Sequence, residues 1–388
     1  MDKEFSVIHL PTTVGGNSTG LSNALKKLKV KSFTCTYEQN YIQYKTDMVL
    51  FNSKDSYILR EIKKIKLLIN VIKKMDIIHF NSGATIASSN AYPILNLIKT
   101  NPKKYFLKFI GAFYSNIFEL IELILLKIFK KPMFITFQGD DARQGDYISA
   151  NFKVSIASQV DVFYYNSKSD VFKRNKINRI SKFASKIYAL NPDLLYVLPK
   201  NAEFLPYCHI NIDDWKPKYP YPINRPLKIL HAPTNRSVKG TNLIIDTLDR
   251  LENEGFKFEL ILVEGVDYES AKKLYMDADI LIDQLYAGWY GGLAVELMAL
   301  GKPVVSFIRK KDLKYIPKKM KNDLPIIDIT PFDIYDVMKS VLSMSPTEIK
   351  DLGIISRKYV EKWHNSIDIA KRLKQDYEEA LSKIFERK

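Results

Sequence analysis

The sequence is poor in cysteine, glycine and proline, and each shortage excludes a class of protein. It has only two cysteines, Cys35 and Cys208, among 388 residues. Two cysteines so far apart offer neither a disulfide framework nor a cysteine-based zinc site, and they favour a reducing compartment. Fifteen glycines and 17 prolines are too few for a fibrous or low-complexity chain. With 46% hydrophobic residues, the composition is that of a folded protein long enough for two domains.

Acidic residues are also in the minority. The chain has 43 Asp and Glu against 59 Lys and Arg, a formal net charge of +16. The lysines are spread along the chain, and no zinc-finger, RNA-binding or basic-zipper pattern accompanies them, so no nucleic acid is expected as a partner. Attraction to an anionic membrane and a lysine-rich solvated surface both remain as explanations of the excess.

The first residues lack the pattern of a secretory signal. Residues 1–16 contain no charged segment followed by a long apolar core. We therefore expect the protein in the cytoplasm, with the inner face of the cell membrane as an alternative location.

Short apolar strands alternate with amphipathic helices along the chain. The first strand, at 5–10, is followed by Gly15, Gly16 and a helix at 21–29. This order is the opening unit of a doubly wound α/β domain. The G-x-G-x-x-G spacing of a dinucleotide site is absent, so the glycine pair by itself predicts only a tight turn.

A segment rich in Pro, Asn, Asp and Tyr divides the chain into two such units. We predict a first domain over 1–206, a linker over 207–226 and a second domain over 227–362. The last segment, 363–388, has an apolar stripe at helical spacing and predicts a final helix.

Residues 103–131 predict an unusually apolar helix with lysine pairs at both ends. Lys108, Glu119, Glu122 and Lys127 interrupt the apolar run, so a bilayer-spanning helix is not expected. Two interpretations stay open. The helix either dips an apolar face into a membrane surface or packs inside the first domain.

The most informative stretch is 278–305. It predicts a buried strand, a glycine-broken loop, a short helix at 293–300 and a second buried strand. Free amides at a helix N-terminus, approached through Gly291 and Gly292, form an anion site. Glu296, one turn into the helix, adds an acceptor for hydroxyl groups. The stretch outlines a nucleotide-diphosphate site, and a plain strand–loop–helix joint explains the same pattern.

Residues 296–304, Glu-Leu-Met-Ala-Leu-Gly-Lys-Pro-Val, resemble the donor-site signature of GT-B glycosyltransferases of the large retaining family 4. That signature has two glutamates eight positions apart, and Glu296 matches the second, which in the family holds the ribose hydroxyls. Gly288 stands at the first position, so the sequence departs from the pattern. Three nearby residues are candidates to replace the missing glutamate: Asp283, Gln284 and Tyr290.

The resemblance implies a fold and an activity. The fold would be α/β of the GT-B type, in which two Rossmann-like doubly wound domains face each other across a cleft and the C-terminal helix crosses back to the first domain. The activity would be retaining transfer of a sugar from a nucleotide diphosphate, with no metal and no cofactor. The acceptor would be a hydroxyl of a cell-surface glycan or a lipid-linked saccharide. A lipid-linked acceptor favours peripheral membrane contact through 103–131.

The segment 138–143 resembles the family pattern Phe-His-Gly-Ser-Asp-x-Arg. Gln138 replaces a histidine that in the family points at the transferring sugar; glutamine hydrogen-bonds but does not titrate. Asp141 and Arg143 match, and Arg143 is expected to pair with a neighbouring carboxylate. Asp140 and Asp141 are candidates to act as a base or to orient the acceptor, which keeps an inverting route open. A helix cap explains one of them equally well.

The resemblance also assigns residues to the donor. Lys239 matches a lysine that neutralises the departing diphosphate, and Arg236 stands near the position of its partner arginine. Glu264 follows a strand where the family receives the base. The predicted donor site comprises Gly15, Gly16, Arg236, Lys239, Glu264, Asp283, Tyr290, Gly291, Gly292, Leu293 and Glu296.

Two other functions fit the same sequence. A nucleotide-sugar epimerase shares this two-domain fold, but its need for titratable groups argues against it in a chain with few histidines. A catalytically silent subunit of a glycan assembly complex would bind a nucleotide sugar without turnover, and the missing glutamate and histidine support it.

Overall fold

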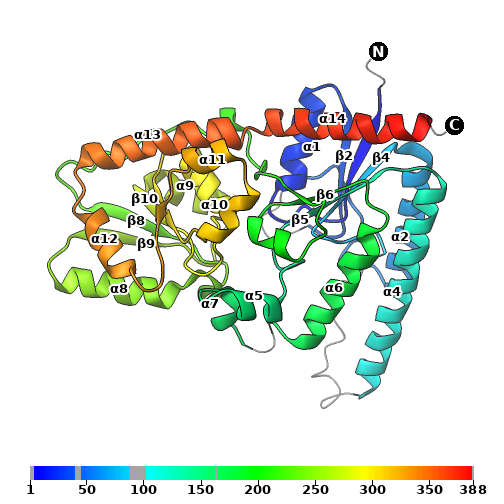
Figure 1. The fold of residues 1–388 in the computed structure, drawn as a ribbon, viewed down its shortest axis with the longest axis horizontal. Helices are drawn as coiled ribbons and strands as arrows, with labels where there is room; N and C mark the ends of the chain where they lie inside the picture. Colours follow the sequence, from blue (N-terminus) through cyan, green and yellow to red (C-terminus); the bar gives the residue numbers. More distant parts are fainter. Residues whose placement is uncertain (1–3, 40–44, 88–101, 162–163, 387–388) are drawn as a thin grey trace.

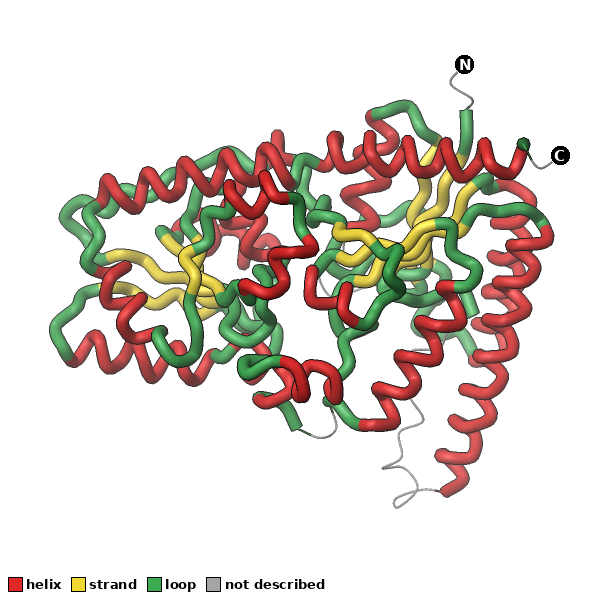
Figure 2. The backbone as a smooth tube through the Cα atoms, in the orientation of Figure 1, coloured by secondary structure: helices red, strands yellow, loops and turns green. Residues whose placement is uncertain are grey.

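The computed structural model describes residues 4–39, 45–87, 102–161 and 164–386. Figure 1 shows two α/β lobes side by side, with β1 and the last helix on the same lobe. In Figure 2 the strands of each lobe lie between helices on both sides. This arrangement explains why consecutive residues of the central strands are buried, instead of every second one.

All strands of the first lobe are parallel, in the order β3-β2-β1-β4-β5-β6-β7. They are β1 (Ser6–Leu10), β2 (Lys31–Thr36), β3 (Met48–Val49), β4 (Ile77–Asn81), β5 (Met133–Phe137), β6 (Lys186–Ala189) and β7 (Glu203–Phe204). The helical segments are α1 (Asn17–Lys27), α2 (Tyr57–Lys74), α4 (Pro102–Ile128), α5 (Gly145–Asn151), η1 (Ile156–Ser158), α6 (Ser167–Ser181) and η2 (Pro192–Tyr196). Every residue of β1, β4 and β5 is buried.

The second lobe has a smaller parallel sheet in the order β12-β11-β10-β8-β9. Its strands are β8 (Leu227–His231), β9 (Phe258–Leu262), β10 (Ile280–Ile282), β11 (Val304–Ser306) and β12 (Ile327–Asp328). Its helical segments are α7 (Arg236–Lys239), α8 (Thr241–Asn253), α9 (Tyr268–Asp277), α10 (Gly292–Ala299), η4 (Lys310–Tyr315), α11 (Lys318–Asp323), α12 (Ile334–Leu342) and α13 (Pro346–Trp363).

The final helix, α14 (Ser366–Phe385), packs on the first lobe although it follows the second in the chain. The Tyr377 hydroxyl lies 2.6 Å from Nδ1 of His79 in β4, and Asp376 accepts hydrogen bonds from Lys186 and Tyr188 of β6. The predicted return of the last helix is therefore confirmed. The chain crosses between the lobes a first time near η3 (Ile212–Asp214). The exact domain boundaries given above stay predictions.

The inward face of α4 contains two buried glutamates, and its outward face is apolar. Glu119 and Glu122, which the sequence presented as interruptions of the apolar run, both point inward and are 1% and 0% exposed. Glu119 pairs with Arg179, and Glu122 accepts hydrogen bonds from the amides of Ile86 (3.0 Å) and Ala87 (2.8 Å). Burial raises the pKa of Glu122 to about 7, against the effect of these amides.

The outward face of α4 is apolar instead. Over its residues with described side chains, 111 and 113–128, the exposed large residues are Phe113, Tyr114, Ile117, Leu120, Ile121, Ile124 and Ile128. The side chains of 102–110, including the first lysine pair, lie outside the described part. A search of the described residues finds no helix with the length and hydropathy needed to cross a bilayer.

Candidate donor and acceptor site

The first predicted group lies in the loop after β5, at the carboxyl edge of the first sheet. Both carboxylate oxygens of Asp141 accept backbone hydrogen bonds, from the amides of Gln138 (3.0 and 3.1 Å) and Gly139 (2.6 Å). Burial raises the pKa of Asp141, although the two amides oppose the rise. Asp141 therefore closes the turn and caps no helix, since the N-cap of α5 is Gln144, and its oxygens are not free to act as a base.

Asp140 and Arg143 belong to a second network in this loop. Arg143 Nη1 donates to Asp140 (2.9 Å), which confirms the predicted pairing, and Nε donates to Asp193 (2.7 Å). The hydroxyls of Tyr164 and Tyr165 also donate to Asp140. Burial alone would raise the pKa of Asp140, but Arg143 and the two hydroxyls outweigh it, so the pKa lies below its ordinary value. Asp140 is thus a weak, fully engaged base.

Sequence reasoning missed Asp193. It follows β6, the strand next to β5, and is 4% exposed in the short helix η2. Neighbouring parallel strands end at the same edge of a sheet. A polar residue just after β6 could therefore have been predicted to lie near the residues that follow β5.

The glycine pair lies beside Gln138. Gly15 and Gly16 have φ of 71° and 70°, which side chains rarely adopt, so the turn itself selects glycine. A Cβ added to Gly15 would lie 3.2 Å from Oε1 of Gln138. The other amide atom of Gln138, Nε2, is buried without a hydrogen-bond partner in the described part of the chain. A buried unpaired donor is unfavourable in the free protein, so this amide is available to a ligand oxygen.

At the predicted phosphate position of the second lobe, a carboxylate of the protein bridges the predicted residues. Lys239 Nζ donates to Oδ1 of Asp283 (2.6 Å), and the Gly291 amide donates to Oδ2 (2.7 Å). Gly291 precedes α10, whose N-terminus has no side-chain cap. The first amides of this helix, at Gly292 and Leu293, have no partner within the helix. Asp283 therefore links the Lys239 ammonium to the amide of Gly291, directly before α10.

Glu296 lies one turn further into α10 and is 5% exposed. The Tyr268 hydroxyl donates to its Oε1 at 3.3 Å. His209 Nε2 lies 3.4 Å from the same oxygen, and the His209 side chain is only 3% exposed. No motif pointed to His209, because it belongs to the interlobe segment and reaches the site only through folding.

Of the remaining predicted donor residues, some lie at the edge of the second sheet and one lies in the core. Arg236 forms two hydrogen bonds with Glu264 (2.7 and 2.8 Å) on the exposed rim of the second sheet. Tyr290 is not at the site. It is fully buried, and its hydroxyl bonds to Tyr359 and His364, both at 2.8 Å. Gln284, considered with it, donates its side-chain amide to the carbonyl of Trp289.

Arg309 fills the space beside Gly288. A Cβ on Gly288 would lie 2.4 Å from Arg309 Nη1. That guanidinium is held by Asp312 (2.9 Å), by the Val154 carbonyl of the first lobe (3.0 Å) and by stacking 4.0 Å from the Phe152 ring. Burial raises the pKa of Asp312 to about 6, opposed by Arg309. The surroundings of Gly288 are therefore a contact between the lobes.

Restoring the family residue by Gly288→Glu is therefore expected to destabilise the protein. Gly288 has a φ of 81°, and an ordinary residue in that region is strained by about 1 to 3 kcal/mol. Displacement of Arg309 adds to the strain. Gly255→Glu is the matched control, because Gly255 has a φ of 96° and nothing within 4 Å of an added Cβ. The melting temperature of Gly288→Glu should fall below that of Gly255→Glu; equal values would contradict the role of Arg309.

The interlobe segment connects the two groups of residues. The Cys208 amide donates to Oδ1 of Asn17 (3.0 Å), whose Nδ2 donates to the Gly15 carbonyl (3.2 Å). The next residue, His209, lies against α10: a Cβ on Gly292 would be 3.5 Å from its ring. Groups on facing edges of the two sheets thus approach one interlobe site. Among the described residues, no cluster of three or more His, Cys, Asp or Glu has a metal-binding arrangement.

The first lobe also contains a cavity of about 610 Å³ between the ends of β1 and β2 and the start of α2. Its walls include the stacked rings of Tyr37 and Phe51, whose centroids are 5.1 Å apart. Arg60 and Glu61 also line it. Aromatic faces together with charged hydrogen-bonding groups are suited to a saccharide.

Comparisons with known proteins support the fold through structure only. No family model and no curated protein sequence matches the chain. A glycosyltransferase from Rickettsia africae is similar over 98% of this chain and 99% of its own, with a TM-score of 0.57 and 15% identity. Sucrose-phosphate synthase from Thermosynechococcus elongatus is similar over 98% of this chain and 100% of its own, with a TM-score of 0.52 and 14% identity.

A UDP-GlcNAc 2-epimerase from Neisseria meningitidis, solved with UDP-GlcNAc, is similar over 96% of this chain and 98% of its own, with a TM-score of 0.50 and 11% identity. Transferases and an epimerase are thus similar to the same chain, so the likeness identifies the architecture and not the reaction. The two parallel sheets, their covering helices and the returning α14 establish that this chain has the GT-B fold.

Proposed function

We propose that the protein is a glycosyltransferase that moves a sugar from a nucleotide-diphosphate donor to a hydroxyl of a cell-surface glycan or lipid-linked saccharide. One observation carries the proposal: the half-buried Lys239 ammonium, the uncapped N-terminus of α10 and the Glu296 carboxylate lie along one sheet edge. A cation and free amides suit a diphosphate, and a carboxylate one turn away suits ribose hydroxyls.

Each group has a role in this proposal. Lys239 and the amides of Gly292 and Leu293 stabilise the charge that develops on the departing diphosphate. Glu296 accepts hydrogen bonds from the ribose. The unpaired amide of Gln138 donates to a hydroxyl of the transferring sugar, and the Arg236–Glu264 pair borders the base. Donor binding exchanges the internal carboxylate of Asp283 for phosphate oxygens around Lys239.

The engagement of the two aspartates supports a retaining reaction. An inverting transfer needs a base at the acceptor hydroxyl. Asp140 is paired with Arg143 and two tyrosines, and both oxygens of Asp141 are held by backbone amides. Neither carboxylate is placed to take a proton without breaking these contacts. The cavity beside Tyr37 and Phe51 is the proposed location of the acceptor saccharide.

The proposal includes contact with a membrane through 103–131. The outward face of α4 exposes Ile117 (45%), Ile121 (47%) and Ile124 (41%) along one stripe. An apolar face of this kind suits an interfacial helix. The acidic residues of α4 do not oppose it, because both are buried.

The helix α2 extends this face. It runs beside α4 in the same direction: Tyr57 approaches Gly111 near their starts, and Lys131 donates to the Met75 carbonyl past their ends (2.6 Å). A second apolar stripe, spaced at three and four residues, lies along α2. Its exposed members are Ile58, Ile62, Ile65 and Ile69.

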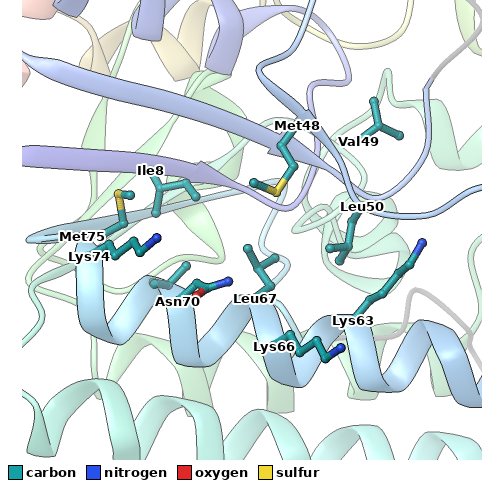
Figure 3. A pocket seen from close by; sticks show the side chains of 11 residues that line it. Ile8, Met48, Val49, Leu50, Lys63, Lys66, Leu67, Asn70, Lys74 and Met75 are labelled. Carbon is teal, nitrogen blue, oxygen red and sulfur yellow. The ribbon is translucent and has the colours of Figure 1, made fainter.

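Lysines border this apolar face. Three exposed lysines belong to α2: Lys66, Lys73 and Lys74. Two more are Lys127 in the last turn of α4 and Lys130 just after the helix. Figure 3 shows Lys63, Lys66 and Lys74 on one flank of α2, around a cavity of about 330 Å³ with an apolar floor. Cations that surround apolar side chains match an anionic bilayer, which offers both kinds of contact.

A thermal-shift screen against UDP, GDP, dTDP, CMP and ADP tests the donor assignment. A nucleotide present at about a hundred times its dissociation constant adds about 2.7 kcal/mol to the free energy of unfolding. We expect one of them to stabilise the wild type and to lose this effect in Glu296→Ala. Stabilisation by none of them would remove the basis of the proposal.

The same nucleotide, supplied as its sugar conjugate, separates the other two functions. A transferase releases the nucleoside diphosphate only when an acceptor is present. Binding with no release under any acceptor would identify a silent scaffold subunit. Conversion of the donor to its C2 epimer without an acceptor, followed by NMR, would identify an epimerase.

A further inference from the structure

One buried histidine in the interlobe segment has no role in the fold that accounts for its position. The His209 side chain is 3% exposed, yet neither ring nitrogen has a hydrogen-bond partner among the described residues. Among the sheet histidines, His79 and His231 have partners on both ring nitrogens, whereas His9 of β1 is unpaired as well but lies within the first sheet, among other buried residues. A buried unpaired imidazole is unfavourable unless a ligand completes it.

The surroundings of His209 identify the kind of ligand. Its Nε2 lies 3.4 Å from Glu296 Oε1, and its ring is 3.5 to 3.6 Å from a Cβ placed on Gly292. The imidazole therefore lies against the first turn of α10, where free amides and the helix dipole favour an anion. No protein carboxylate other than Asp283 and Glu296 is recorded in contact with this turn in the described residues.

The segment that carries His209 is fixed from both sides. The Cys208 amide is bonded to Asn17 in the first turn of α1, and a Cβ on Gly20 would lie 2.1 Å from the Cys208 carbonyl oxygen. Gly20 is thus the residue that lets the segment pass at this distance. The Tyr207 ring is edge-on to His209, with centroids 6.1 Å apart. The imidazole is held in place before any ligand arrives.

We propose that His209 Nε2 is a ligand of the donor diphosphate, contributed by the connection between the lobes. The proposal rests on the donor site proposed above and adds to it a residue that neither sheet supplies. In the free protein Nε2 faces Glu296; with donor bound, its N–H donates to a phosphate oxygen at the N-terminus of α10. Because His209 belongs to the interlobe segment, phosphate binding also restrains the crossing between the lobes.

The test compares a nucleoside diphosphate with its nucleoside on the full-length protein. Calorimetry would use the nucleotide from the screen that stabilises the wild type, for example UDP with uridine. For His209→Leu we expect the dissociation constant of the diphosphate to rise about 10- to 100-fold, since a hydrogen bond to a charged group is lost. The dissociation constant of the nucleoside should change less than about twofold. His209→Gln, which retains an amide donor, should recover part of the affinity.

A stability measurement separates this role from a structural one. Replacing an unpaired buried imidazole by leucine should leave the melting temperature of the ligand-free protein unchanged or raise it. A large fall would show that His209 is structural and would overturn the proposal.

Glu296→Gln is the comparator for the binding data, because it should weaken nucleoside and diphosphate alike. The same pattern in His209→Leu would mean that His209 only positions Glu296, which overturns the proposal and leaves the donor site intact. Unchanged diphosphate affinity in His209→Leu overturns it in the same way. Failure of every nucleotide to bind the wild type would instead remove the donor site itself.

Discussion

Lys239→Met should lower kcat/KM for sugar transfer by about 100- to 1,000-fold, the range found when one preorganised donor is removed from a site of developing negative charge. Lys239 shares the Asp283 carboxylate with the Gly291 amide before α10, and only 12% of its side chain is exposed. The substitution also leaves Asp283 buried without its cation, next to the position of the phosphates. Loss of attraction and new repulsion act in the same direction. The measurement is kcat/KM with the accepted donor, together with the dissociation constant of the nucleoside diphosphate.

The double variant Lys239→Met/Asp283→Asn divides these two effects. It still lacks the attraction of Lys239 but no longer has the repulsion from Asp283, so donor affinity should recover in part while kcat stays low. Lys257→Met, at an exposed lysine of the same lobe, is the control for loss of one positive charge. If Lys239→Met retained kcat/KM within about threefold of the wild type, the phosphate site would have to lie elsewhere.

Ile117→Glu/Ile124→Glu should reduce binding to vesicles of mixed zwitterionic and anionic lipid by about 100-fold. Each half-exposed isoleucine is expected to contribute about 1 to 1.5 kcal/mol on insertion, and about 1.4 kcal/mol corresponds to a factor of ten. Both residues lie on the outward stripe of α4 and are 45% and 41% exposed, so the fold should tolerate the change. Sedimentation with vesicles measures the effect. Binding should also fall with salt and with removal of anionic lipid, because lysines border the face.

A matched control exists on the second lobe. Phe332 and Ile355 are 69% and 49% exposed, so Phe332→Glu/Ile355→Glu adds the same two charges at exposed apolar positions outside α2 and α4. This variant should bind vesicles almost as the wild type does. Equal loss in both variants would indicate a general charge effect. A wild type that does not bind vesicles but dimerises through α4, seen as a concentration-dependent mass, would assign the face to a second copy of the chain.

The parts of the fold that were predictable depend on patterns local in sequence. The strands and helices around Lys239, Gly291 and Glu296 follow from apolar runs between glycines, and their order alone predicts that these residues lie near one sheet edge. The stripe of α14 likewise indicated a packed helix, and the family resemblance indicated which lobe it covers. In each case one short segment contains the whole signal.

The contacts that could not be predicted join residues from distant segments of the chain. Asp193 approaches Arg143 across 50 residues, and Arg309 reaches the space beside Gly288 from the following strand–helix connection. The sequence also does not show that Asp283 neutralises Lys239, because two residues of opposite charge near one site suit an internal pair and a ligand equally well. Tyr290 was misplaced because a tyrosine in a glycine loop has the same pattern whether it faces a cleft or a core.

The returning helix α14 has a consequence for how the protein is made. Its Tyr377 packs against Phe134 of the first lobe, with ring centroids 4.6 Å apart, and bonds to His79. During translation the ribosome synthesises all of the second lobe before it reaches this helix. The first lobe must therefore remain uncovered at β4 and β5 for that whole interval, whatever its own folding speed. The nascent chain can thus complete its first-made domain only after its second has been synthesised.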